Sequence, residues 1–350
     1  MWRRLMPFFG AKTERFNAFA RFAAREAFGR RLACLSASPT LSRDSHFPFE
    51  KPLNFSPMTA PRYRGRFAPS PTGALHFGSL VAAVGSWLVA RHHGGEWLVR
   101  VEDIDPPREV PGSAVSILST LDAFGLAPDA APVYQSQRHT LYTAAFERLR
   151  DAGHLFPCWC SRADLAAHGG LHRDGRCIAA PDPARPPAWR LRSPDRVVGW
   201  HDDLQGPQVE NLRDVAGDFV IRRVEGLWSY QLACVVDDGD QGITHVVRGA
   251  DLLDSTARQI HLQGLLGLPT PGYLHLPLVV DAEGRKLSKS TAALPVDPAD
   301  PLPALHEALT WLGVAAPGAA ASPEALLRHA LDGFSPATLR RSSLTAGTTL

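Results

Sequence analysis

The stretch RFAPSPTGALHFGSL, residues 66–80, contains residue types that could bind a phosphate group. Its prolines end a short strand and its last residues begin a helix, which predicts a helix N-terminus at the carboxyl edge of a parallel sheet. The unpaired N–H groups and the dipole of such an N-terminus favour an anion. Gly78 would let a ligand approach the backbone, and His76 could donate to a phosphate oxygen. The alternative is an ordinary helix start, with Ser79 as the cap and a surface histidine.

A second candidate for phosphate binding is KLSKS, Lys286 to Ser290, which follows an apolar strand and a glycine-containing turn. Two lysines separated by small hydroxyl-bearing residues can wrap a polyphosphate. A solvated basic loop is the common alternative. The two motifs together are much less common than either alone, so the pair indicates a nucleotide site.

The elements around these motifs predict an α/β fold. A strand in YRGRFAPS, a helix in HFGSLVAAVGSWLVARHHGG and a buried strand in EWLVRVED form a β–α–β unit, which implies a parallel sheet with a right-handed crossover. Helices are expected at 113–124 and 137–152, and a strand followed by a helix within 242–267. The stretch DFVIRRVEGLWSYQLACVVDD predicts two strands joined at Glu225-Gly226, and two or three helices are expected in the tail.

Composition and charge narrow the class of protein. The 350 residues are 45% apolar and 21% charged, with a net charge of +2, so no strongly basic surface is implied. No apolar run is long enough for a membrane span, and the first residues lack the apolar core of a secretory signal. Five cysteines do not suit a disulfide framework in a chain of this length, and we expect a reduced, cytoplasmic setting.

Residues 1–57 differ in composition from the rest, being rich in Arg and Phe and poor in acids. A transit peptide or a nucleic-acid-binding arm could have this composition. We favour a disordered N-terminal extension that is dispensable for activity, with Met58 as the true start.

Together the two motifs resemble the HIGH and KMSKS signatures of class I aminoacyl-tRNA synthetases, with HFGS and KLSKS in their places. RFAPSPTGALHFGSL, LVRVEDID, LWSYQLACVVDD and THVVRGADLLDSTARQ are similar to the glutamyl branch. The resemblance extends from about Arg64 to Lys289 and implies a Rossmann-like catalytic domain. Residues 290–350 are too few for both a connecting bundle and an anticodon-reading domain. A short glutamyl-type core with a Cys-x-Cys insertion resembles the glutamyl-queuosine tRNA(Asp) synthetases.

This resemblance implies ATP-dependent activation of L-glutamate as glutamyl-adenylate. Glutamate would then pass to the queuosine base in the anticodon loop of tRNA(Asp). ATP, Mg²⁺, L-glutamate and queuosine-bearing tRNA(Asp) are the expected substrates, cofactors and partners of a monomer without membrane contacts. Alternatives are a glutamyl-tRNA synthetase with a shortened C-terminus that charges tRNA(Glu), a pantothenate-synthetase-like adenylyltransferase, and a non-catalytic tRNA-binding paralogue.

The resemblance also assigns site residues. The glutamate site would comprise Arg66, Phe67, Ala68, Pro69, Ser70, Glu102, Tyr230 and Arg248, and the ATP site His76, Gly78, Ser79 and Lys289. Arg66 would contact a substrate carboxylate through a bidentate fork, Glu102 would pair with the α-ammonium, and Arg248 would be a second cationic contact. Catalysis would be electrostatic and positional, through His76, Lys286 and Lys289. Without the resemblance, Glu102 could be an exposed acid at the end of a strand, Tyr230 a core residue and Arg248 a helix cap.

The cysteines near residue 160 predict a structural zinc site. Cys158, Cys160 and Cys177 lie in one insertion, and three thiolates with one more ligand would make a closed tetrahedral site. The family has a tyrosine as fourth ligand, whereas this chain offers His172 and Arg173. Histidine binds zinc and arginine does not, so His172 replaces the tyrosine or the site is weakened or lost. We expect Cys234 to be an inert core residue in an apolar strand, and Cys34 to lie outside the domain.

The expected organisation has five parts. They are the extension 1–57, the first half of the catalytic domain 58–157, the insertion 158–215, the second half with the KLSKS loop 216–292, and the helical tail 293–350.

Overall fold

The computed structural model describes residues 62–166, 168–280, 295–341 and 344–345, which belong to one compact unit, Thr59–Leu350. The expected extension 1–57, with Cys34, and both lysines of KLSKS lie outside the described residues. Within these described ranges, no helix has the length and apolar character needed to cross a membrane.

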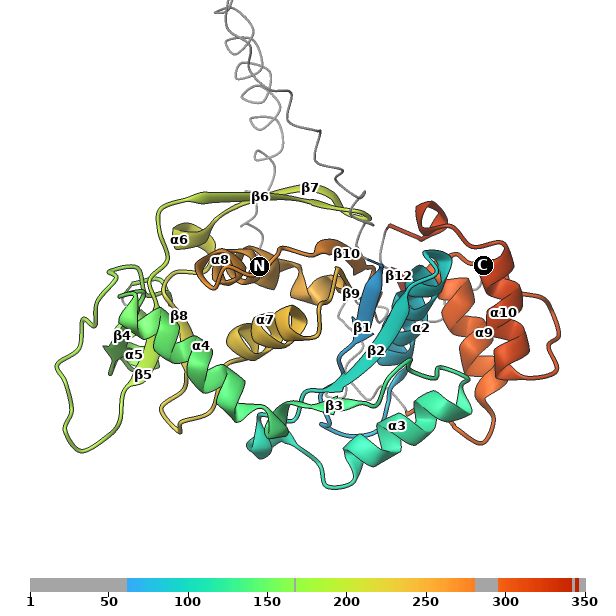
Figure 1. The fold of residues 1–350 in the computed structure, drawn as a ribbon, viewed down its shortest axis with the longest axis horizontal. Coiled ribbons are helices and arrows are strands. Elements are labelled where there is room, and N and C mark those ends of the chain that lie inside the picture. Colours follow the sequence, from blue (N-terminus) through green and yellow to red (C-terminus); the bar gives the residue numbers. More distant parts are fainter. Residues whose placement is uncertain (1–61, 167, 281–294, 342–343, 346–350) are drawn as a thin grey trace, which may run out of the picture. The chain divides into compact units, whose positions relative to one another are not determined.

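A parallel sheet forms the centre of the fold, as predicted (Figure 1). Strand β1 (Arg64–Phe67) pairs in parallel with β2 (Glu96–Val101), and β2 with β3 (Val133–Tyr134). Strands β9 (His245–Gly249) and β10 (Gly272–Leu276) also pair in parallel. The N–H of Thr244 donates to the Arg64 carbonyl at 3.0 Å, which joins the two groups of strands. The α/β class is therefore confirmed.

Helix α2 (Phe77–His92) connects β1 to β2. Leu80, Val84 and Leu88 on its buried face are fully covered, and Gly94 follows it in the left-handed conformation. The helix begins one residue after His76, whose side chain accepts the N–H of Ser79. His76 and not Ser79 is therefore the N-cap, because the imidazole Nδ1 takes the place of the usual hydroxyl acceptor.

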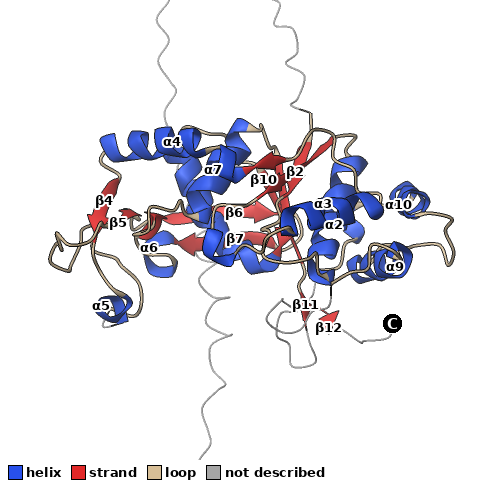
Figure 2. Ribbon diagram, turned by 90° about the horizontal axis from the view of Figure 1, so that it is seen from below, coloured by secondary structure: helices blue, strands red, loops and turns tan. Residues whose placement is uncertain are grey.

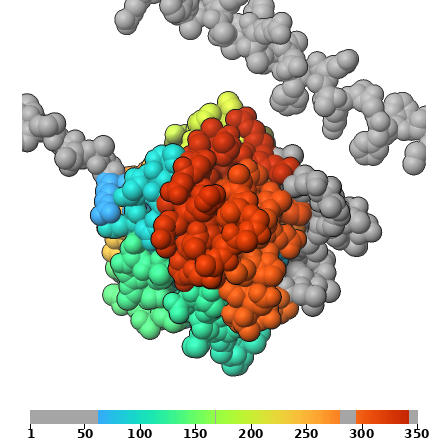
Figure 3. All heavy atoms as spheres, turned by 90° about the vertical axis from the view of Figure 1, so that its right-hand side faces the viewer, coloured from blue at the N-terminus to red at the C-terminus, as the bar shows by residue number. Residues whose placement is uncertain are grey.

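The C-terminal helices complete the same core. Helix α9 (Pro301–Leu312) packs against α2, with Trp311 edge-on to Phe77, and α10 (Pro323–Asp332) contributes buried leucines to the same cluster. In Figure 3 the orange and red tail segments cover the centre of one face. The predicted helical tail is confirmed, and it shares one hydrophobic core with α2.

Other helices follow the expected pattern with one exception. The predicted helices at 113–124 and 137–152 are α3 (Ser113–Ala123) and α4 (His139–Asp151), and α8 (Thr256–Leu265) follows the 3₁₀ segment Ala250–Ser255. The second strand predicted within DFVIRRVEGLWSYQLACVVDD is wrong from Tyr230 onward, where the chain forms helix α7 (Tyr230–Asp240). The turn at Gly226 is correct, but pairing after it is limited to one bridge between Arg222 and Trp228, and the Ser229 side chain then caps the helix. A short apolar run does not by itself distinguish a strand from a buried helix.

Two further sets of strands lie within and beside the Cys-rich insertion. Strands β4 (Leu155–Cys158), β5 (Ala188–Leu191) and β8 (Phe219–Arg222) form an antiparallel sheet, which lies at the opposite end from α9 and α10 (Figure 2). The hairpin of β6 (Val197–Asp202) and β7 (Gly206–Asn211) joins β10 through parallel pairing of Asp202 with Tyr273. The remaining elements are short: α5 (Arg162–Ala166), α6 (Leu212–Val215), β11 (Val279–Val280), β12 (Leu344–Thr345), and 3₁₀ turns at Pro106–Arg108, Gln135–Gln137 and Pro336–Thr338.

Candidate active site

A cavity of about 730 Å³ lies at the carboxyl ends of β1, β2, β9 and β10, where open parallel sheets bind ligands. Residues separated by up to 213 positions in the chain, from Arg66 to Val279, line it together. All the predicted glutamate- and ATP-site residues within the described ranges are among them: Arg66, Phe67, Ala68, Pro69, Ser70, His76, Gly78, Ser79, Glu102, Tyr230 and Arg248. The fold therefore brings these eleven residues to one place.

The N-terminus of α2 forms one wall of this cavity. The Nδ1 atom of His76 accepts the Ser79 N–H at 3.3 Å, and the Nε2 atom lies 3.0 Å from Ser79 Oγ. Because Nδ1 accepts, the neutral ring carries its proton on Nε2 and donates it to the hydroxyl. No acidic residue lies in the first helical turn, so the dipole of this 16-residue helix favours an anion here.

The described residues that flank 281–294 lie at the cavity on one side and beside the His76 loop on the other. Val279, before the gap, lines the cavity. After it, Pro295 forms a bridge with His76, and the Val296 N–H donates to the Leu75 carbonyl at 3.0 Å. Pro295 and Val296, which follow the segment that contains KLSKS, thus contact the wall on which His76 stands.

Arg66 is held by a carboxylate on helix α7. Its Nε and Nη2 atoms lie 3.1 and 3.4 Å from the two carboxylate oxygens of Asp238, and its side chain is almost fully buried. Asp238 therefore occupies the side-on fork of the guanidinium. Nη1 has no hydrogen-bond partner among the described residues, and Arg66 lines the cavity. Arg66 can offer Nη1 to a ligand.

Glu102 is a buried acid and not an exposed strand end, with 9% of its surface accessible. Its Oε1 accepts from Arg100 Nη2 at 3.3 Å, and Arg100 also donates to Asp238 at 2.7 Å. Burial raises the pKa of Glu102, although the charges of Arg100 and Arg66 oppose this. Burial also acts to raise the pKa of Asp238, but the same two arginines outweigh it and lower that pKa to about 2. Asp237, also buried, lies 3.7 Å from Arg100 Nε, so two buried cations and three buried carboxyl groups form one network.

Tyr230 and Arg248 meet on another side of the cavity. Nη1 of Arg248 donates to the Tyr230 hydroxyl oxygen at 3.2 Å. Because that oxygen accepts, its own proton is free to be donated to another acceptor. Burial raises the pKa of Tyr230, which keeps the phenol protonated. Nη2 of Arg248 donates to the Leu252 carbonyl and to the Thr256 hydroxyl, so Arg248 also binds two acceptors at the N-terminus of α8.

Sequence reasoning missed the charged network behind Arg66. Arg100 and Asp238 are buried, and each stands beside apolar residues, in WLVRVED and LACVVDD. A charged residue within an apolar run was the available signal. Cys234 is buried as expected but lies on α7, with Sγ 3.5 Å from Asp238 Oδ2. Burial raises the pKa of this thiol to about 12, so it remains protonated.

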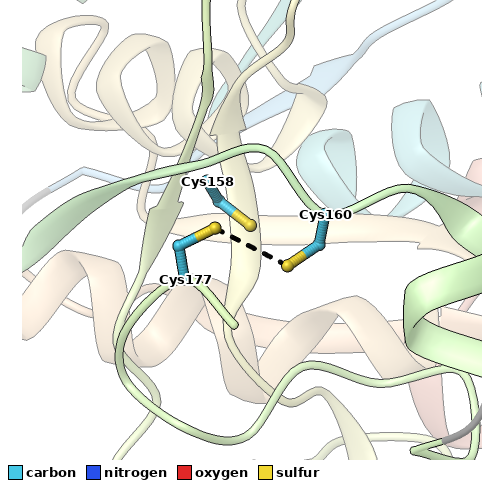
Figure 4. Close-up of side chains that lie close together, drawn as sticks. All are labelled: Cys158, Cys160 and Cys177. Carbon is cyan, nitrogen blue, oxygen red and sulfur yellow. Dashed lines mark hydrogen bonds between the residues drawn. The ribbon is translucent and has the colours of Figure 1, made fainter. Parts of the chain in front are cut away.

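Three cysteines of the insertion form a second candidate site (Figure 4). The sulfur atoms of Cys158, Cys160 and Cys177 all lie within 4.8 Å of one another, and those of Cys160 and Cys177 are 3.7 Å apart. Tetrahedral zinc with Zn–S bonds of about 2.3 Å places two sulfurs about 3.8 Å apart. Burial raises the pKa of Cys158 to about 11, whereas at Cys177 hydrogen bonds such as that from the Trp159 N–H outweigh burial and lower the pKa. The donor set and spacing fit zinc.

His172 lies outside this group of sulfur atoms. Its Nδ1 is hydrogen-bonded to Asp218 at 2.8 Å, and its buried Nε2 has no partner among the described residues. The ring packs against Phe156, two residues before Cys158. Arg173 donates to backbone carbonyls of Arg213 and Asp214.

Comparisons with known proteins identify the family of this chain. The family described as "tRNA synthetases class I (E and Q), catalytic domain" matches residues 62–300. Two proteins named "Glutamyl-Q tRNA(Asp) synthetase" are similar over most of this chain. That of Burkholderia cenocepacia is 58% identical over 74% of this chain and 90% of its own, and that of Xanthomonas axonopodis pv. citri is 56% identical over 81% and 95%. A solved glutamate tRNA ligase from Elizabethkingia meningosepticum, in complex with its amino acid, superposes with a TM-score of 0.67 at 26% identity, over 81% of this chain and 67% of that one.

Proposed function

Because the chain belongs to the glutamyl-Q tRNA(Asp) synthetases, a branch of the class I tRNA synthetases, we propose that its cavity activates L-glutamate with ATP and then esterifies the queuosine base of tRNA(Asp). The chain is a ligase of this family. The cavity accommodates both parts of an adenylate, since it joins a helix N-terminus suited to phosphate with a set of buried charges suited to an amino acid.

Glutamate has two carboxylates and one ammonium group, and the cavity offers complementary charges. Arg66 Nη1 is the available donor for one carboxylate, and Arg248 is the second cation. Glu102 would pair with the α-ammonium, and the Tyr230 hydroxyl would donate to a substrate oxygen. Because the side-on fork of Arg66 is occupied by Asp238, we expect it to contact the substrate through Nη1 and not through that fork.

ATP would place its phosphates at the N-terminus of α2. His76 carries its ring proton on Nε2, next to Ser79, and Gly78 leaves the backbone accessible. The α-carboxylate of glutamate then attacks the α-phosphorus and pyrophosphate leaves, without a covalent enzyme intermediate. We propose that Lys286 and Lys289 neutralise charge on the phosphates. Pro295 and Val296, which follow these lysines in the chain, contact the His76 loop, and this supports the proposal. Mg²⁺ on the pyrophosphate would supply further charge neutralisation.

The observation that carries this proposal is the convergence of the eleven predicted residues on one cavity. Glutamate-dependent exchange of labelled pyrophosphate into ATP, without tRNA, tests it. We expect exchange with glutamate and much less with aspartate or glutamine. A folded, pure protein that gives no exchange with glutamate would revive the non-catalytic paralogue.

We propose that Cys158, Cys160 and Cys177 hold one structural zinc ion, which would fix the loops of an insertion with little core. Arg190, whose Nε donates to Cys158 at 3.3 Å, would help to stabilise a thiolate. His172 is the proposed fourth ligand, and its ring would have to move toward the sulfur atoms, because it lies outside their group here. Its Nε2 is unpartnered among the described residues, and Asp218 binds its other nitrogen. We also propose that the protein acts in the cytoplasm, where its tRNA is found, and that it is a monomer.

A further inference from the structure

Arg248 has no idle donor in this structure. An arginine has five N–H donors, and each points to a protein acceptor. Nε donates to His275 Nε2 at 3.0 Å. Nη1 donates to Gln259 Oε1 at 2.8 Å and to the Tyr230 hydroxyl at 3.2 Å. Nη2 donates to Thr256 Oγ1 at 2.9 Å and to the Leu252 carbonyl at 3.2 Å. A substrate carboxylate must therefore replace one of these acceptors, and the 3.2 Å contacts are the longest. The shorter contacts, to His275, Gln259 and Thr256, then hold the guanidinium in position.

The contact to His275 fixes the state of that ring. Arginine is always charged and its Nε only donates, so Nε2 of His275 must accept. The neutral ring then carries its proton on Nδ1, which donates to Asp202 Oδ2 at 2.5 Å. Both side chains are fully buried. Burial, with the charge of Arg248, lowers the pKa of His275, which agrees with a neutral ring.

Asp202 is in turn held by the backbone. Its Oδ1 accepts the N–H groups of Leu204, Gln205 and His275, at 3.1, 2.8 and 3.2 Å. Burial acts to raise the pKa of Asp202, but the hydrogen bonds from His275 and Gln205 outweigh it and lower the pKa. The carboxylate stands at the end of β6, which pairs with β10. It is thus a rigid, ionised acceptor facing Nδ1.

We propose that Asp202 and His275 are positioning residues for substrate binding by Arg248. Asp202 selects the Nδ1–H form of His275, which leaves Nε2 free to accept Arg248 Nε. The guanidinium then keeps its Nη atoms toward Tyr230 and the cavity. This inference rests on the proposed glutamate site, and it extends that site to two residues that do not line the cavity.

Replacement of Asp202 by Asn should change the tautomer of the His275 ring. The amide oxygen of Asp202→Asn can still accept the backbone N–H groups, so its NH₂ faces His275 Nδ1. Nδ1 must then accept, the ring proton moves to Nε2, and two N–H groups, those of His275 and Arg248, face each other. The same logic makes the carboxylate-to-amide change costly in the serine protease triad, a known example.

The test measures glutamate activation by pyrophosphate exchange in the full chain, with Asp203→Asn as matched control. Asp203 is the next residue and its side chain is exposed. For Asp202→Asn we expect KM for glutamate to rise about 5- to 150-fold, the range for one unsatisfied buried donor, with KM for ATP unchanged. Ring ¹⁵N shifts of His275 should show proton transfer from Nδ1 to Nε2, which a purely structural role would not produce. A folded variant with unchanged KM for glutamate, or with the proton still on Nδ1, overturns the proposal.

A second pair of variants keeps the proposal testable if Asp202→Asn does not fold. His275→Gln retains an acceptor that can reach Arg248 Nε, whereas His275→Leu does not. We expect a large rise in KM for glutamate only in the leucine variant, and equal values in the two overturn the proposal. Loss of all exchange in the wild-type chain would instead refute the proposed function, while the ¹⁵N measurement would still report on the ring.

Discussion

Replacement of Asp238 by Asn removes the negative charge between two buried arginines. Asp238 accepts from Arg66 at 3.1 and 3.4 Å and from Arg100 at 2.7 Å, and the arginine side chains are at most 3% exposed. The amide can accept one of these bonds, but its NH₂ group meets a second donor. We expect Arg66 to lose its fixed orientation and KM for glutamate to rise.

The size of the effect on stability follows from the pKa of Asp238, which the arginines lower from 3.8 to about 2. This displacement corresponds to about 2 to 3 kcal/mol in favour of the ionised folded state. Since the pKa is lowered on folding, this contribution is complete above the ordinary pKa of 3.8 and is lost as pH falls toward about 2. Asp238→Asn should therefore unfold more easily at pH 7 by about 2 to 3 kcal/mol, and the difference should narrow below about pH 4.

Urea unfolding at pH 7 and at acidic pH measures this difference, with Asp240→Asn as the control. Asp240 lies on the same helix and pairs with Arg138, but its side chain is 50% exposed. Exposed ion pairs contribute about 1 kcal/mol or less. If Asp238→Asn is as stable as Asp240→Asn at pH 7, the buried network does not have the assigned energetic role.

Three further predictions concern the substrate sites and the metal. Because burial raises the pKa of Glu102, KM for glutamate should rise as pH falls through that pKa, whereas Glu102→Gln should give a high and pH-independent KM; parallel pH profiles in the two proteins would contradict the assignment. Lys289→Ala should sharply reduce pyrophosphate exchange without changing the unfolding midpoint, and normal exchange would remove this lysine from the ATP site. Elemental analysis of protein never exposed to chelator should find about one zinc per chain, with loss in Cys177→Ser and weaker retention in His172→Gln; equal retention in His172→Gln would exclude His172 as a ligand.

The parts of the site nearest to the motifs could be predicted from the sequence. A strand, a proline-rich turn and a helix within residues 64–92 already place an anion-binding N-terminus at a sheet edge. The β–α–β order then brings Glu102, at the end of the next strand, to the same edge. Tyr230 and Arg248 required the family resemblance, because their surroundings are equally typical of a core residue and a helix cap.

The supporting charges could not be placed from the sequence because they depend on contacts between distant segments. Asp238 reaches Arg66 and Arg100 only because residues 230–240 form a helix, and the short apolar run did not reveal this. Asp202 and His275 are 73 residues apart and meet through the pairing of β6 with β10. Neither residue stands in a motif, so local sequence gave no sign of their contact.

The measurement that tests the central claim most directly is transfer of labelled glutamate, with ATP, to three RNAs: tRNA(Asp) with queuosine, tRNA(Asp) without it, and tRNA(Glu). The family to which the chain belongs predicts label only on the first, at a position removed by cleavage of the anticodon loop. Label on the 3′ end of tRNA(Glu) would contradict it and would show an ordinary charging enzyme built on the same cavity.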